Sequence, residues 1–158
     1  MAAHRRRQKR SVHFRSDSCE WATPQDLFDA LSERFGGFTL DPCATAENAK
    51  CAAYFTRAQD GLAQIWTGRV WCNPPYGRAI GHWLRKGWES VQDGTAELVV
   101  CLVPSRTDAS WWHEHAAKGE VEFLRGRLRF GGAENGAPFG SALVVFRNAP
   151  DRYETASY

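Results

Sequence analysis

Apolar side chains recur along the chain first at helical and then at strand-like spacing. Four of them lie on one helical face before a pair of glycines, with Leu31 three or four residues after Phe28 and Leu27 and four before Phe35. This spacing predicts a helix that Gly36–Gly37 ends. Thr23 is suited to its N-cap and Pro24 to its first helical position.

The same spacing predicts a second helix from Ile80 to Gln92. Its expected core face consists of five large apolar residues: Ile80, Trp83, Leu84, Trp88 and Val91. Because tryptophans on such a face are more often core than binding residues, we assign Trp83 and Trp88 to the core. A short helix from about Glu47 to Ala53, and a third around Trp111–Trp112, are also expected.

Short apolar or β-branched runs between these helices predict strands. The runs cover residues 38–40, 54–56, 70–72, 98–103, 121–124, 128–130 and 142–146. Leu98–Val103 is apolar throughout, which is typical of a central parallel strand buried on both faces. The last strands are expected to form a hairpin or antiparallel edge. The sequence therefore predicts an α/β fold, a doubly wound, mostly parallel sheet with antiparallel C-terminal strands, in one domain of residues 20–150.

Composition and charge fit a single soluble globular domain. The chain has 158 residues, 43% of them apolar and 24% charged. The first fifteen residues hold six of the 20 Lys and Arg residues and none of the 18 Asp and Glu residues. We interpret residues 1–19 as a basic arm that seeks phosphate, although a solvated terminus or a targeting signal has the same composition. Residues 151–158 are expected to form a C-terminal tail.

Membrane and metal functions have little support in the sequence. No apolar run is long enough for a transmembrane helix, and the N-terminus is too polar for a signal peptide. The five cysteines contain no Cys-x-x-Cys pair, which favours reduced thiols in a cytoplasm over disulfides or zinc. His113 and His115 are two residues apart, so a helix would not place them on one face. We therefore expect no metal.

The most unusual stretch is Val70–Gly77, where a buried strand runs directly into Asn-Pro-Pro-Tyr-Gly. Prolines lack a backbone N–H and fix φ, so the chain must leave the sheet here, with Asn73 at the strand tip. An amine placed there could donate one hydrogen to the Asn73 side-chain oxygen and another to the Pro74 carbonyl. Tyr76 offers a face for stacking a planar heterocycle. A turn that merely ends the strand is the alternative.

Two more polar residues, Asp41 and Asp60, fall at or beside the ends of predicted strands. Ligands of doubly wound sheets bind beyond the carboxyl ends of the strands. We therefore expect Asp41, Asp60 and Asn73 to converge on one rim. Taken singly, an Asp-Pro turn explains Asp41 equally well, and a plain turn explains Asp60 better than a binding role does.

The order of the motifs resembles that of a known family. The chain contains Trp-x-Thr-Pro, Leu-Asp-Pro-Cys-Ala, Asp-Gly-Leu, Asn-Pro-Pro-Tyr-Gly, Leu-Val-Pro-Ser-Arg and Gly-Arg-Leu-Arg-Phe, the last followed by Ala-Pro-Phe at residues 137–139. Asn-Pro-Pro-Tyr resembles motif IV of the S-adenosylmethionine-dependent amino-methyltransferases. Residues 20–146 resemble the small phage-type DNA N-6-adenine methyltransferases (Dam-like). One departure is the absence of a Gly-x-Gly cofactor loop.

The resemblance implies a reduced methyltransferase-type sheet, S-adenosylmethionine as cofactor, and site-specific or weakly specific methyl transfer to the N6 amine of adenine in DNA. The implied catalytic residues are Asn73, Pro74, Pro75 and Tyr76. The implied cofactor-binding residues are Trp21, Thr23, Pro24, Asp41, Pro42, Cys43, Ala44, Asp60, Gly61 and Asn73. The implied DNA-binding residues are Tyr76, Arg78, Arg106, Arg127 and Arg129, although each arginine is more often a solvated surface residue.

Adenine in a duplex cannot reach such a pocket, so the base is expected to be flipped out. Too few residues follow Pro104 for a separate target-recognition domain, which predicts weak sequence selectivity. Base reading would then fall to the Gly131–Gly140 loop, the basic arm or a second subunit, and both a monomer and a homodimer remain open. Location in the cytoplasm of a bacterial host and a phage or prophage origin are expected. The alternatives are an RNA or protein-glutamine methyltransferase with the same site, or a non-catalytic DNA-binding module.

Overall fold

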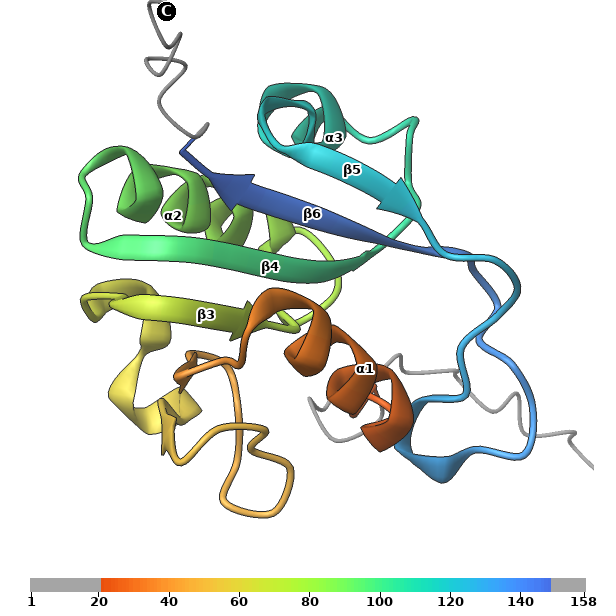
Figure 1. Ribbon diagram of the computed structural model, residues 1–158. Helices are drawn as coiled ribbons and strands as arrows, with labels where there is room; N and C mark the ends of the chain where they lie inside the picture. The colour runs from red at the N-terminus through yellow and green to blue at the C-terminus, as the bar shows by residue number, and fades with distance from the viewer. Residues whose placement is uncertain (1–20, 149–158) are drawn as a thin grey trace, which may run out of the picture.

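The computed structural model describes residues 21–148, so the expected arm at 1–19 and tail at 151–158 lie outside it. The described chain forms one six-stranded sheet with helices on both faces (Figure 1). The strands are β1 (Leu40–Asp41), β2 (Ala53–Tyr54), β3 (Gly68–Cys72), β4 (Ala96–Pro104), β5 (Glu120–Phe123) and β6 (Ser141–Arg147). The α-helices are α1 (Gln25–Phe35), α2 (Ile80–Gln92) and α3 (Ser110–Glu114).

The sheet has the order β2-β1-β3-β4-β6-β5. β1 pairs in parallel with β2 and β3, and β3 pairs in parallel with β4. β6 runs antiparallel to both β4 and β5. The prediction of a mostly parallel sheet with antiparallel C-terminal strands is therefore confirmed. β4 is central, as expected from its unbroken apolar run, but only its β3 side is parallel.

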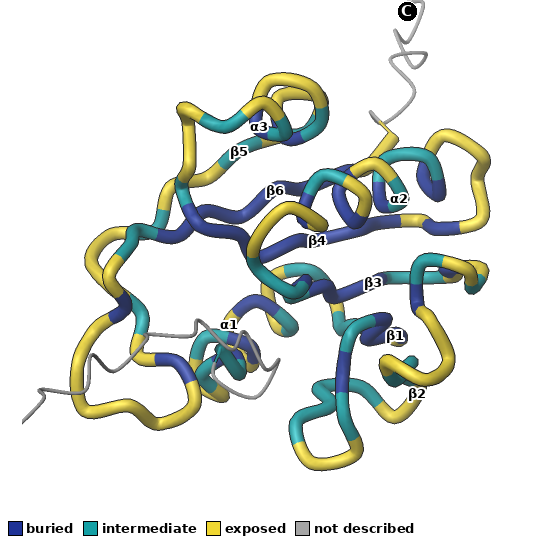
Figure 2. The backbone as a smooth tube through the Cα atoms, turned by 180° about the vertical axis from the view of Figure 1, so that it is seen from behind, coloured by how far each residue is buried: buried dark blue, intermediate teal, exposed yellow. Residues whose placement is uncertain are grey.

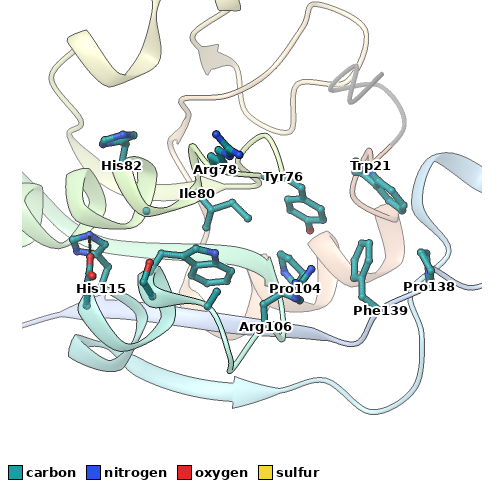
Figure 3. A pocket seen from close by; sticks show the side chains of 16 residues that line it. Trp21, Tyr76, Arg78, Ile80, His82, Pro104, Arg106, His115, Pro138 and Phe139 are labelled. Atoms are coloured by element: carbon teal, nitrogen blue, oxygen red, sulfur yellow. Dashed lines mark ion pairs between the residues drawn. The ribbon is translucent and has the colours of Figure 1, made fainter. Parts of the chain in front are cut away.

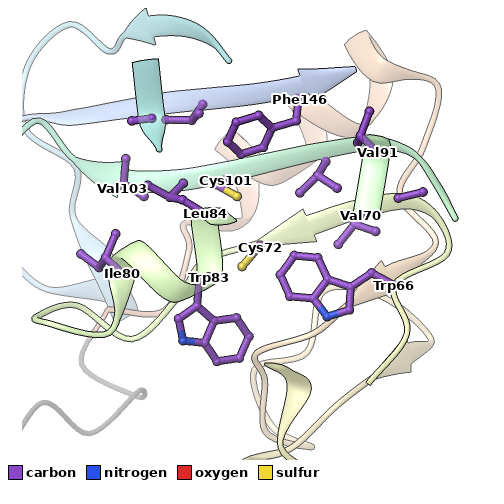
Figure 4. Packing of buried hydrophobic residues seen from close by; sticks show 14 of the residues in the cluster. Trp66, Val70, Cys72, Ile80, Trp83, Leu84, Val91, Cys101, Val103 and Phe146 are labelled. Carbon is purple, nitrogen blue, oxygen red and sulfur yellow. The ribbon is translucent and has the colours of Figure 1, made fainter. Parts of the chain in front are cut away.

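Two apolar layers cover the two faces of the sheet. On one face α1 places Phe28 and Leu31 against Trp71 and Leu102. On the other face α2 and α3 cover a cluster that includes Trp66, Trp83, Leu84, Val91 and Phe146 (Figure 4). Figure 2 shows the buried residues concentrated in β3, β4 and β6 and on the inner side of α2.

α2 begins and ends at the predicted residues because its apolar spacing matches its buried face. Ile80, Trp83, Leu84 and Val91 are buried, while Trp88 is only half-buried and lies against Lys118. Six of the predicted strands are present, and their ends differ from the predicted ends by at most two residues.

The predicted helix at Glu47–Ala53 is wrong. Thr45 and Asn48 form a single turn in which each side chain accepts a hydrogen bond from the other residue's backbone N–H. The Lys50 N–H then donates to the Asp41 carboxylate instead of continuing a helix. Side-chain bonds of this kind compete with helical hydrogen bonds, and β2 begins within the predicted helix at Ala53.

Two further details of the prediction are corrected. Pro24, not Thr23, occupies the N-cap of α1, since its carbonyl accepts the first helical N–H from Phe28. The Thr23 hydroxyl instead accepts a hydrogen bond from Asn73. The predicted strand at 128–130 is absent, because Phe130 turns into the aromatic cluster at the end of β3 and starts a 3-10 turn, Phe130–Gly132.

The described residues contain neither a membrane-spanning helix nor a cluster of metal ligands. No helix within residues 21–148 has the length and apolarity needed to cross a membrane. In the same part of the chain no three His, Cys, Asp or Glu side chains gather closely enough to hold a metal ion. Cys43, Cys51, Cys72 and Cys101 are all unpaired thiols.

Candidate active site

Asn73 follows β3 directly, and its amide group is held in one orientation. Nδ2 donates to the Trp21 carbonyl at 2.7 Å and to Thr23 Oγ1 at 3.1 Å. Both amide hydrogens are therefore used. The Asn73 Oδ1 atom is buried and has no hydrogen-bond partner. Since an unpaired buried acceptor is costly, this arrangement leaves an oriented acceptor at the tip of the strand.

Tyr76 lies three residues further on, within a cluster of aromatic rings. Trp21 stacks on its ring, with centroids 5.9 Å apart and planes inclined by 24°. Phe139 and Phe130 approach edge-on at 5.5 and 6.1 Å. The phenolic oxygen is buried without a hydrogen-bond partner. Burial raises the pKa of Tyr76 far above its usual value, so the phenol stays protonated at neutral pH.

Residues 21–23 form a strap that lies across the motif. The strap is bonded to Asn73 on one side, and its Ala22 carbonyl accepts the Gly131 N–H at 2.9 Å on the other. Trp21 also contacts Phe130 and Phe139 at centroid distances of 5.4 and 5.0 Å. The strap therefore links the Asn-Pro-Pro-Tyr segment to the loop before β6.

A groove of about 1060 Å³ opens beside Tyr76. Its walls come from the segment after β3 and from the segment after β4, including Arg78 on the first and Arg106 on the second. In Figure 3, Trp21, Phe139 and Pro138 lie at one end and His82 and His115 at the other, with Tyr76 between. The groove thus joins an aromatic end, two arginines and a histidine end.

A second cavity, of about 630 Å³, lies at the carboxyl ends of β1, β2 and β3. Three short segments line it: residues 42–47 after β1, residues 56–61 after β2, and Pro75 after β3, with Trp83 of α2. Pro75 lines this cavity and Tyr76 lines the groove, so the two spaces meet at the Asn-Pro-Pro-Tyr segment.

Gly61 gives this cavity its shape. A Cβ at Gly61 would overlap the carbonyl oxygen of Pro42 and lie 3.1 Å from Trp83 Cη2. The Gly61 carbonyl also accepts the indole N–H of Trp66 at 2.8 Å. Close approach of the segments after β1 and β2 therefore requires glycine here.

Asp41 lies beneath the first of these segments instead of lining the cavity. Its carboxylate is buried and accepts the backbone N–H groups of Cys43 at 3.3 Å and of Lys50 at 3.0 Å. Burial raises the pKa of Asp41 to about 6, although these two hydrogen bonds oppose the change. The carboxylate therefore shapes the loop that forms one wall of the cavity.

The structure sorts the residues that the sequence singled out into three places. Five of the expected cofactor residues line the second cavity: Pro42, Cys43, Ala44, Asp60 and Gly61. Trp21, Tyr76, Arg78 and Arg106 line the groove instead. Thr23, Pro24, Asp41, Asn73 and Pro74 lie in neither lining. Arg127 and Arg129 are exposed on the loop after β5 and line neither space.

Several lining residues were not anticipated from the sequence. In the cavity they are Thr45, Ala46, Glu47, Thr56, Arg57, Ala58 and Trp83. In the groove the main ones are His82, Trp111, Glu114 and His115, whereas Phe139 belongs to the Gly131–Gly140 loop that the sequence indicated. The segments after β3 and β4 face one another because the two strands are neighbours, and the rule that ligands bind at carboxyl ends would have indicated both.

Two curated proteins are similar to this chain. The "DNA N-6-adenine-methyltransferase" of Escherichia phage T1 is 24% identical over 152 residues, which cover 80% of this chain and 62% of that protein. The chain therefore spans less than two thirds of this relative's length. The "Putative methyltransferase YfdM" of Escherichia coli (strain K12) is 39% identical over 64 residues, covering 36% of this chain and 70% of that protein.

A family model gives the broadest match. The model described as DNA N-6-adenine-methyltransferase (Dam) matches residues 10–157, which include the whole described sheet and both cavities. Together with the order of the motifs along the strand ends, this match shows that the chain belongs to the DNA N-6-adenine-methyltransferase (Dam) family.

Proposed function

We propose that this protein transfers a methyl group from S-adenosylmethionine to the N6 amine of adenine in DNA, on a reduced methyltransferase-type sheet. One observation carries the proposal. Asn73 Oδ1 is a buried acceptor without a hydrogen-bond partner, and the Asn73 Nδ2 group donates to the Trp21 carbonyl and to the Thr23 hydroxyl. Family membership and the similarity to the phage T1 DNA N-6-adenine-methyltransferase support adenine as the substrate.

The second cavity fits the proposed cofactor in size and lining. Its volume of about 630 Å³ lies within the range of sites for small ligands and cofactors. The wall is mostly apolar, with hydroxyls at Thr45 and Thr56 and carboxylates at Glu47 and Asp60 that suit a cationic ligand. When bound, S-adenosylmethionine supplies an activated methyl group on a sulfonium. Pro75, two residues after Asn73, lines this cavity, which supports a cofactor site next to the Asn-Pro-Pro-Tyr segment.

The chemical difficulty is the adenine N6 amine, whose lone pair is delocalised into the ring. Asn73 Oδ1 would accept one N6 hydrogen and the Pro74 carbonyl the other. Both hydrogen bonds favour the pyramidal nitrogen of the transition state over the planar ground state, so they act as differential binding. The amine becomes acidic once it carries the methyl group, so no strong base is needed before transfer. The rigid Pro74–Pro75 backbone keeps the acceptors in place.

Adenine would reach this acceptor only after leaving the duplex. In the structure Trp21 stacks on the Tyr76 face on which the base is expected to lie. The Trp21 ring must therefore move off that face before it can receive a base, while the Trp21 carbonyl and the Thr23 hydroxyl keep their bonds to Asn73. Arg78 and Arg106 line the groove next to Tyr76 and would hold the flanking phosphates.

Tritiated methyl transfer to unmethylated DNA tests the role of Asn73. Asn73→Ala removes the acceptor and should lower kcat by about 100-fold or more, the loss typical of one transition-state hydrogen bond of this kind. Asn73→Asp keeps an acceptor oxygen but loses the donor to Trp21. It should retain clearly more activity than Asn73→Ala, and thermal unfolding of both variants controls for folding.

The proposal fails if Asn73→Ala keeps its activity within a few-fold of the wild type. Mass spectrometry of the digested product separates N6-methyladenine from methylated cytosine, and parallel reactions with RNA or a protein substrate test the alternative acceptors. Calorimetric titration with S-adenosylmethionine identifies a non-catalytic DNA-binding module, because such a module would give no heat of cofactor binding.

A further inference from the structure

The groove beside Tyr76 is larger than one flipped base requires. Its volume of about 1060 Å³ exceeds the usual upper range for a single small-ligand site. We propose that its far end, formed by His82, Trp111 and His115, binds the nucleobase next to the target adenine on the same strand. This inference rests on the proposed function and names a second base-binding site in the same groove.

Close packing between α2 and α3 builds this end. A Cβ added at Gly81 would lie 3.2 Å from Trp111 Cβ and 3.4 Å from His115 Cδ2, so the two aromatic residues lie against the start of α2. Figure 3 shows His82 and His115 at this end, opposite Trp21 and Phe139. The site therefore sits on two helices and not on a loose loop.

Trp111 provides the surface for stacking. Its ring is half-buried and lines the groove, while the neighbouring Trp112 is buried behind it with centroids 5.7 Å apart and planes inclined by 56°. A ring supported in this way loses little side-chain freedom when a base stacks on it. Stacking on aromatic residues binds single-stranded nucleic acid with little preference among bases.

The charges distinguish a base from a phosphate at this end. Glu114 lines the groove, with its carboxylate 3.7 Å from His115 Nε2. Burial lowers the pKa of His115, which favours the neutral imidazole. A carboxylate beside a neutral imidazole repels a phosphate but accepts hydrogen bonds from base amino groups. The arginines stand elsewhere in the lining, where they suit the phosphate that joins the two nucleotides.

His115 also has an unused polar atom. Its Nδ1 is buried and has no hydrogen-bond partner. A shift of the ring that exposes this nitrogen would let a planar ligand in the groove supply the partner, either directly or through a water molecule. This observation is independent of the groove's size and favours a ligand with hydrogen-bonding edges over a purely apolar one.

A series of short deoxynucleotides tests the proposal by competition against a fluorescent single-stranded oligonucleotide. The probes are deoxyadenosine with a single 5′- or 3′-phosphate, dinucleotides with the second nucleotide on the 5′ or the 3′ side, and the same dinucleotides with an abasic second sugar. We expect one of the two intact dinucleotides to bind on the order of tenfold more tightly than its abasic counterpart, as the loss of one stacked base predicts.

Variants of Trp111 test whether this residue provides the added affinity of the intact dinucleotide over its abasic counterpart. The ratio of intact to abasic affinity should fall to near one in Trp111→Leu and persist in Trp111→Phe, which keeps an aromatic face. Trp88→Leu is the matched control, because Trp88 is another half-buried tryptophan, lies on Lys118 and does not line the groove. Its ratio should match that of the wild type.

Three outcomes would overturn the proposal: equal affinity for intact and abasic dinucleotides, a gain that survives Trp111→Leu, or an equal loss in Trp88→Leu. The first would show that this end binds only the phosphate-sugar backbone. If Trp111→Leu does not fold, the abasic comparison in the wild type and the Trp111→Phe variant still decide the question. The assay measures binding, so it separates this inference from the proposed function, whose failure would appear as absent methyl transfer.

Discussion

Asn73 has two amide hydrogens and one amide oxygen, and the structure uses them differently. The hydrogens hold Trp21 and Thr23, and the oxygen remains free. An asparagine whose donors are occupied cannot flip its amide without losing both bonds, so the acceptor direction is fixed before any substrate binds. The same two bonds hold the strap over Tyr76, which couples the orientation of the acceptor to the position of Trp21.

Asp41 supports a prediction about pH. Burial raises its pKa from 3.8 to about 6 in the folded protein. The folded state therefore binds the proton more tightly than the unfolded chain, and this contribution to stability is complete below about pH 4 and is lost as the pH rises through about 6. The loss amounts to roughly 3 kcal/mol, from about 1.4 kcal/mol for each pKa unit.

Urea unfolding of the wild type and Asp41→Asn at pH 4, 5, 6 and 7 checks this expectation. The substitution adds a constant cost, because its amide N–H₂ must face the N–H of Cys43 or of Lys50. The wild type should lose stability relative to the variant as the pH rises from 4 to 7. Titration of His115 affects both proteins and cancels in the difference. Parallel pH profiles would show that Asp41 is ionised normally.

At the scale of elements, the segments after β1 and β2 form the second cavity only because they touch at Gly61. Gly61→Ala places a methyl group on the Pro42 carbonyl oxygen, which is backbone and cannot rotate away. We expect a loss of about 1–3 kcal/mol in the free energy of unfolding, the usual cost of overpacking. The displaced segment should also weaken cofactor binding.

Gly140→Ala is the control for this substitution. A Cβ at Gly140 would lie 3.6 Å from Ser105 Oγ, an ordinary contact, so its effect should stay below about 1 kcal/mol. Urea unfolding and calorimetric titration with S-adenosylmethionine compare the two variants. Equal stability and equal cofactor affinity in both variants would show that the close contact at Gly61 does not shape the cavity.

The elements also show which parts of the fold a sequence can predict. α2 matches its prediction because one regular apolar spacing coincides with one buried face. The helix expected at 47–53 fails because Thr45, Asn48 and Asp41 bind backbone N–H groups that a helix would need. The strand expected at 128–130 fails because Phe130 packs against Trp21 and Tyr76, residues distant in the sequence.

The sequence likewise indicates some parts of the candidate site and not others. The motifs at the ends of β1 and β3 were visible because prolines and polar residues directly follow apolar runs. The wall formed by Trp111 and His115 was not, since it depends on β4 lying next to β3 and on the packing of α3 against Gly81. Arg127 and Arg129 were expected from their charge and from the family-like motif Gly-Arg-Leu-Arg-Phe, and the structure leaves them outside both cavities.

At the scale of the whole molecule, the two cavities lie on either side of one rigid segment. Pro75 lines the smaller cavity and Tyr76 lines the groove, so ligands in the two spaces would meet at the Asn-Pro-Pro-Tyr segment without sharing most of their contacts. Under the proposed function, the cofactor and the nucleic acid would then bind independently. It also means that variants in one cavity should leave binding in the other intact.

Thermal unfolding with S-adenosylmethionine tests this separation. At about 100 times its Kd the cofactor should stabilise the wild type by about 2.7 kcal/mol and raise the Tm by roughly 5–10 °C. Trp111→Leu should show the same increase, because Trp111 lines only the groove, whereas Gly61→Ala should show a smaller one. If Trp111→Leu loses the increase as fully as Gly61→Ala does, the two cavities act as one site, since a change at α3 would then reach a ligand held by the segments after β1 and β2.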